Sequence, residues 1–224
     1  MMNTKRLIFP SLMVFFTLSI LPLTVQAVSM IDNFSDSQQV MDLGSPGVTN
    51  SATFLSDTSS ELTGIRRTLS AEAGVGAINF IVIQVIGSGG ILGITNSPGS
   101  AGTASILWDN FGTVDFNQFA NALKLDVVKL DDKMITVEMI VNGTSNSVFN
   151  IAEVGEYLFD FSSFSDASLF DQVISLEMKL TGPLAWDGQF KLSAVAAPVP
   201  LPPSIFLLSV ALIGFAVVRR NTIV

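Results

Sequence analysis

The sequence predicts an all-β domain, a single antiparallel β-sandwich of jelly-roll-like form, between two short apolar terminal segments. Many short strand-like segments occur along the middle of the chain, and none of its long stretches shows the 3.6-residue period of a helix. Period-two alternation of apolar and polar residues marks half-buried strands at 123–127, 135–141, 174–180 and 190–194. A β-branched run, 78–86, adds a fifth strand. Short strands joined by turns favour an antiparallel sandwich.

Turn-forming residues separate these runs. They occur at 44–47, 87–90, 96–99, 142–143 and 187–188, where Gly, Pro, Asn, Asp and Ser cluster. Residues 131–133, between two alternating runs, predict a tight hairpin loop. The alternation also predicts facing, with Leu176 and Met178 in the core and Glu177 toward water.

Charge and composition limit the partners. Of 224 residues, 49% are hydrophobic and only 13% charged, and the apolar excess lies at the two ends. The middle, 28–197, holds all 19 acidic residues but seven of the 11 basic ones, a net charge of −12. An acidic surface repels phosphate backbones, so no nucleic acid partner is expected. Acidity of this kind keeps a domain soluble.

The chain has no Cys and no His. Disulfides, zinc sites of the Cys/His type and Ser–His–Asp or Cys–His triads are therefore excluded. We expect no cofactor and no enzymatic activity. A hydrolase that uses two converging carboxylates stays open as a third alternative, because the chain has many acids.

The N-terminal segment, 1–27, is predicted to be a signal peptide. Basic Lys5 and Arg6 precede an apolar run, 7–23, which is followed by Val25-Gln26-Ala27. This is the order of n-region, h-region and small-residue cleavage site. We expect signal peptidase to cut after Ala27. The alternative is an uncleaved N-terminal anchor.

The C-terminal segment, 198–224, has three parts: a proline motif at 198–204, an apolar helix predicted at 205–218, and basic residues at 219–220. Fourteen helical residues span about 21 Å, less than the roughly 30 Å hydrocarbon core of a bilayer, so the predicted transmembrane helix is marginal. Paired arginines mark a cytoplasmic end.

This tail resembles the PEP-CTERM sorting tail in its VPLPA-type variant. The matching residues are Val199, Pro200, Leu201, Pro202, Pro203, Arg219 and Arg220. Pro203 stands where the variant usually has Ala. The resemblance implies a Gram-negative bacterium, a transient stage in the inner membrane, cutting by an exosortase-type membrane protease, and delivery to the cell surface or extracellular matrix.

Two Trp-Asp pairs, Trp108-Asp109 and Trp186-Asp187, are candidate ligand-binding residues. An exposed indole beside a carboxylate can stack on a sugar and hydrogen-bond to it. Alternation with neighbouring apolar residues instead favours a core position for both rings. In addition, 31–34 and 185–188 loosely resemble the first and last strands of galactose-binding-like sandwiches.

No metal site is predicted. A structural Ca²⁺ bound by aspartate oxygens is a weaker possibility, with Asp32, Asp36, Asp42, Asp109 and Asp187 as the candidate ligands. No Ca²⁺-loop motif is present, so solvated loop carboxylates are favoured. Arg66-Arg67 is interpreted as a solvated edge.

Together these features predict a non-enzymatic, exported surface or extracellular-matrix protein that an exosortase-type system sorts. The alternative is a carbohydrate-binding module that holds the matrix polysaccharide.

Overall fold

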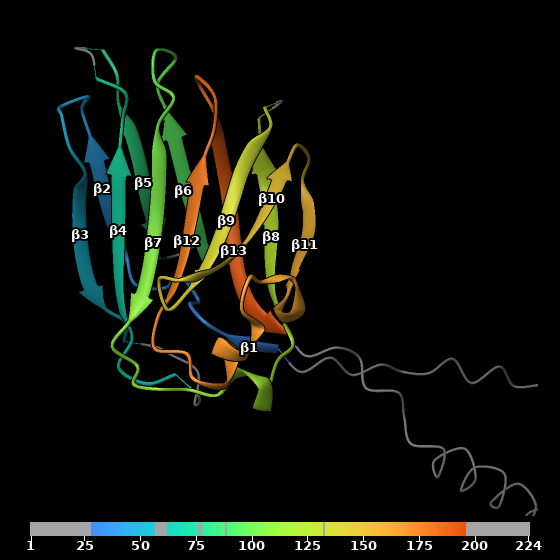
Figure 1. The fold of residues 1–224 in the computed structure, drawn as a ribbon. Coiled ribbons are helices and arrows are strands. Elements are labelled where there is room, and N and C mark those ends of the chain that lie inside the picture. The colour runs from blue at the N-terminus through green and yellow to red at the C-terminus, as the bar shows by residue number, and fades with distance from the viewer. Residues whose placement is uncertain (1–27, 57–61, 76–77, 88, 132, 196–224) are drawn as a thin grey trace, which may run out of the picture. The chain divides into compact units, whose positions relative to one another are not determined.

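The computed structural model describes residues 28–56, 62–75, 78–87, 89–131 and 133–195. They form two antiparallel sheets packed face to face (Figure 1). Sheet A has the strand order β11-β8-β13-β6-β5-β2, and β1 pairs with β13. Sheet B has the order β10-β9-β12-β7-β4-β3 and lies in front in Figure 1. The predicted all-β sandwich is confirmed.

The strands of sheet A are β1 (Val28–Met30), β2 (Gln38–Asp42), β5 (Ile81–Ile86), β6 (Ile91–Asn96), β8 (Ala122–Leu130), β11 (Gly155–Asp160) and β13 (Asp187–Val195). Those of sheet B are β3 (Thr49–Phe54), β4 (Arg66–Glu72), β7 (Thr103–Asp109), β9 (Ile135–Val141), β10 (Ser145–Ile151) and β12 (Leu176–Thr181). The described residues also form three short 3-10 helices, namely η1 (Phe116–Gln118), η2 (Phe161–Ser163) and η3 (Ala167–Asp171). Over the described ranges, no helix has the length and apolar character needed to cross a bilayer.

The predicted strand facing is confirmed on β12. Leu176 and Met178 are fully buried, whereas Glu177 between them is only partly covered. The inward residues of both sheets form one continuous core. Five phenylalanines on and beside the three 3-10 helices extend this core at one end of the sandwich, where the Phe161 and Phe170 rings stack with centroids 3.6 Å apart.

Two turn predictions are wrong. Residues 131–133 do not close a hairpin, because β8 belongs to sheet A and β9 to sheet B, so this connection crosses from one sheet to the other. Asp187 and Gly188 open strand β13 instead of forming a turn. Asn142 and Gly143, by contrast, do connect the β9–β10 hairpin, and both have positive φ, as a type I′ turn requires.

The two predicted targeting segments, 1–27 and 198–224, lie outside the described residues. The described fold begins and ends beside them, since Val28 on β1 and Val195 on β13 are paired in register.

Candidate functional site

Both tryptophans belong to the core. Trp108 and Trp186 have no exposed surface, so neither ring offers a face on which a sugar could stack. The Nε1 of Trp186 donates to the carbonyl oxygen of Gly102 at 3.4 Å. The stacking hypothesis for these residues is therefore wrong, and the core interpretation is confirmed.

Trp108 is part of a buried ion-pair network. Its Nε1 donates to the Asp32 carboxylate at 2.9 Å, and Nη1 of Arg67 donates to both oxygens of that carboxylate at 2.9 and 3.1 Å. Arg67 also donates from Nε to Gln38 and from Nη2 to the carbonyl oxygen of Asp36. Neither charged side chain has any exposed surface. The prediction of a solvated Arg67 is thus wrong, because pairing with Asp32 allows its charge to be buried.

A second ion pair, Arg66 with Asp109, lies on the outward face of β4 and β7. Arg66 binds Asp109 through two parallel hydrogen bonds of 2.9 and 2.6 Å. These two residues are in register on β4 and β7 and point outward. The hydrogen bonds to Asp109 raise the pKa of Arg66. The prediction of a solvated edge is confirmed for Arg66. The carboxylate of Asp109 is already bound to Arg66.

The candidate Ca²⁺ ligands do not converge. Asp36 accepts two hydrogen bonds from Ser56, which lower its pKa, and Asp42 is buried and accepts from the backbone of Ala73. Asp187 accepts from the backbone of Asn96. The solvated-carboxylate interpretation is wrong for Asp42, as it is for Asp32. No group of three or more acidic side chains arranged to hold a metal ion occurs within the described ranges.

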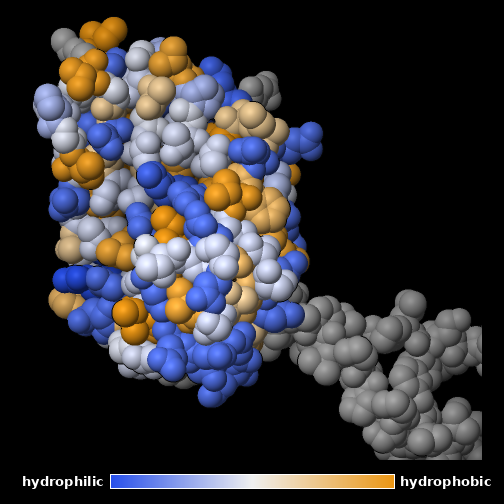
Figure 2. All heavy atoms as spheres, in the orientation of Figure 1, coloured by the Kyte–Doolittle hydropathy of each residue, from blue (hydrophilic) through white to orange (hydrophobic). Residues whose placement is uncertain are grey.

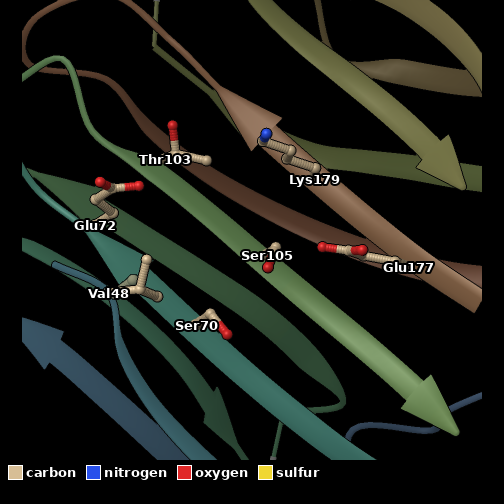
Figure 3. Close-up of a pocket in the computed structure, with 8 residues that line it drawn as sticks. Val48, Ser70, Glu72, Thr103, Ser105, Glu177 and Lys179 are labelled. Carbon is tan, nitrogen blue, oxygen red and sulfur yellow. The ribbon is translucent and has the colours of Figure 1, made fainter. Parts of the chain in front are cut away.

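A hollow of about 170 Å³, lined by six polar residues together with Val48 and Ala71, lies on the outer face of sheet B (Figure 3). Its floor consists of short hydroxyl side chains, Ser70 on β4 and Ser105 and Thr103 on β7. Glu72 borders it on one side, and Glu177 and Lys179 on β12 border it on the other. Sequence reasoning missed the hollow, because it is made by residues from three strands that are far apart in sequence.

Strand register explains the hollow. Ser70 lies directly opposite Ser105, and Ser105 lies opposite Lys179 on the next strand. Because two adjacent serine side chains are shorter than the side chains around them, the surface of the sheet is depressed at this point. Outward alternation on β4, β7 and β12 directs all these side chains to one face.

The hollow's hydrogen-bonding groups are available to a ligand except for Thr103, whose hydroxyl lies 3.5 Å from that of Thr181. Within the described chain, Ser70 and Ser105 make no side-chain hydrogen bond, and no ion pair joins Glu72, Glu177 or Lys179 to another residue. The surrounding face is mixed, with apolar side chains scattered among polar ones (Figure 2). Hydroxyl, carboxylate and ammonium groups together can both donate and accept hydrogen bonds, as a polyhydroxylated ligand requires.

Comparison with known proteins finds similarity among solved structures. No family model and no curated protein matches the sequence. Among solved structures, a family 11 carbohydrate-binding module of the cellulosomal cellulase Lic26A-Cel5E of Clostridium thermocellum is similar, with 11% identity over 76% of this chain and 95% of that one. A family 11 module from the same organism in complex with a β-1,3-1,4-mixed-linked tetrasaccharide has 10% identity over 77% and 96%. Both TM-scores are 0.37.

Proposed function

We propose that this protein is an exported, non-enzymatic surface or matrix protein whose sandwich binds a polysaccharide in the sheet B hollow. The observation that carries the proposal is the hollow itself, where Ser70, Ser105 and Lys179 face solvent with their hydrogen-bonding groups unused by the fold. A sugar chain offers hydroxyl groups that can donate hydrogen bonds to these side chains and accept hydrogen bonds from them.

Charge favours a neutral polysaccharide. Residues 28–197 carry a net charge of −12, and the hollow itself has two carboxylates against one ammonium group. An acidic polysaccharide would be repelled by both, whereas a chain without charge would not. The ligand class is therefore a neutral, hydroxyl-rich glycan.

Export and sorting rest on the terminal sequences alone. The signal-peptide pattern supports export, and the PEP-CTERM resemblance supports release from the inner membrane by an exosortase-type protease. Delivery to the surface or matrix brings the sandwich to where extracellular polysaccharide is found, so the two parts of the proposal fit together.

Retention on an immobilised neutral glucan tests the binding proposal. Full-length protein, in a detergent without a sugar headgroup, should be retained and should leave the glucan unshortened. Ser105→Ile fills the hollow with apolar atoms and should weaken retention. Ala52→Ile, on the same face but outside the hollow, should not. Absence of retention, or shortening of the glucan, overturns the proposal.

A further inference from the structure

A row of amide side chains crosses the outer face of sheet A, on the opposite side of the sandwich from the hollow. Gln39, Gln84 and Gln189 occupy it on β2, β5 and β13, with Gly93 on β6 between the last two and Lys129 on β8 at one end. Each residue is the register partner of the next. The row therefore crosses five strands, over about four strand spacings or roughly 19 Å. The β13–β8 pairing has a register irregularity next to Gln189.

All three glutamines point outward. Their strand neighbours, such as Val40, Ile83 and Phe190, are buried in the core, so alternation places the glutamines on the solvent side. None of the three amides makes a side-chain hydrogen bond to the described part of the chain. Gln38, which points inward, differs in this respect, because it bonds to Ser51 and Arg67.

The row has space for a ligand. Gly93 places no side chain at the centre of the row, and the Gln84 side chain lies over it, 3.6 Å from where a Cβ would be. A glycine inside a strand leaves a place where a ligand can approach the backbone. At the β2–β5 end, Gln39 and Gln84 line a surface hollow of about 350 Å³.

A second hollow on this face is less suited to a ligand. Of its two lysines, Lys124 and Lys191, Lys124 already lies 3.2 Å from Glu156 and 3.3 Å from Asp126. Burial lowers the pKa of Lys124, but the bonds to these two carboxylates outweigh it and raise the pKa. The charge of Lys124 is used within the fold, whereas the amides of the row make no hydrogen bond to the described part of the chain.

We propose that this amide row is a second binding site for a neutral, linear polysaccharide, which makes the sandwich bivalent. Each amide offers two donors and a carbonyl acceptor without charge, which matches sugar hydroxyls. A row of about 19 Å fits an extended chain of several sugars. Because the two sites face opposite directions, one protein can hold two polysaccharide strands. The inference rests on the proposed function and extends it to cross-linking.

Calorimetric titration with a neutral gluco-hexasaccharide tests bivalency. Full-length wild-type protein, in the same detergent, should bind two ligands per chain. The Gln84→Ala/Gln189→Ala variant should bind one, Ser105→Ile should bind one, and the variant that combines all three changes should bind none. Thr95→Ala, on β6 of the same face but outside the row, should still bind two.

The outcomes separate the two proposals. Two ligands in the Gln84→Ala/Gln189→Ala variant, or a single ligand per wild-type chain that Ser105→Ile abolishes, overturns the second site while the proposed function stands. A wild-type protein that binds no hexasaccharide overturns the proposed function and the second site together. A polygalacturonate fragment should give no measurable heat of binding, and tight binding of it would overturn the assignment of a neutral ligand.

Discussion

Arg67 and Trp108 lie directly opposite each other on β4 and β7, and both donate hydrogen bonds to the buried carboxylate of Asp32. Asp32 comes from the connection between β1 and β2, so one carboxylate ties the start of the fold to the middle of sheet B. Asp32 also accepts from the backbone of Phe34, which has a positive φ of 52°.

Asp32→Asn should be strongly destabilising. The substitution leaves the guanidinium of Arg67 buried without its counter-charge, which costs about 3–5 kcal/mol in comparable sites. Urea unfolding of the full-length protein would measure the loss. Asp109→Asn is the matched control, because it removes a carboxylate from the neighbouring exposed pair, and exposed pairs contribute little to stability. Equal losses in the two variants would contradict a structural role for the buried pair.

Core facing on β12 gives a second prediction. Leu176→Ala should lower the free energy of unfolding by about 2–5 kcal/mol, because Leu176 is fully buried. Glu177→Ala, one residue along, should cost under about 1 kcal/mol, as surface changes usually do. Denaturant unfolding compares them, and similar losses would show that the facing is wrong.

Stability should depend on pH through Asp36. Hydrogen bonds from Ser56 lower the pKa of Asp36 below its ordinary value of 3.8. A carboxyl with a lowered folded pKa stabilises the protein above the unfolded pKa, and the effect is lost as pH falls through the folded value. Asp36→Asn should therefore be less stable than wild type at neutral pH, and the difference should shrink below about pH 3.8. Urea midpoints across this range would measure it, and a difference that stays constant would contradict it.

Processing at the two ends can be checked by mass spectrometry of protein recovered from the cell surface. We expect a mature chain that starts at Val28, after signal peptidase, and that lacks Arg219-Arg220, after cutting near Val199–Pro203. Deletion of 205–224 should leave the protein in the soluble periplasm. Surface protein that still carries Arg219-Arg220 would mean that the tail is a permanent anchor.

Local patterns in the sequence predict much of the fold. Period-two alternation locates β9 at its observed bounds and gives the correct facing of β12, because side chains on a strand alternate between core and solvent. Period-two alternation does not predict β3, because this strand is composed mainly of small and polar residues and lies at a sheet edge. Local sequence patterns also do not predict which strands share a sheet. The 131–133 connection is an example, because it joins β8 of sheet A to β9 of sheet B.

The candidate sites depend more on long-range pairing. Arg67 looks like a surface residue in sequence, because its counter-charge, Asp32, lies 35 positions away. Ser70 and Ser105 become a hollow only when β4 and β7 pair in register, and Gln39, Gln84 and Gln189 become a row only across β2, β5, β6 and β13. Register of this kind is set by the whole sheet and cannot be obtained from one strand.

A crystal structure of the protein with a neutral gluco-hexasaccharide tests the central claim most directly. We expect an intact sugar chain on the outer face of sheet B, with its hydroxyl groups within hydrogen-bond distance of Ser70, Ser105 or Lys179. A hexasaccharide that is cleaved, or that leaves the sheet B hollow empty at a saturating concentration, would contradict the account.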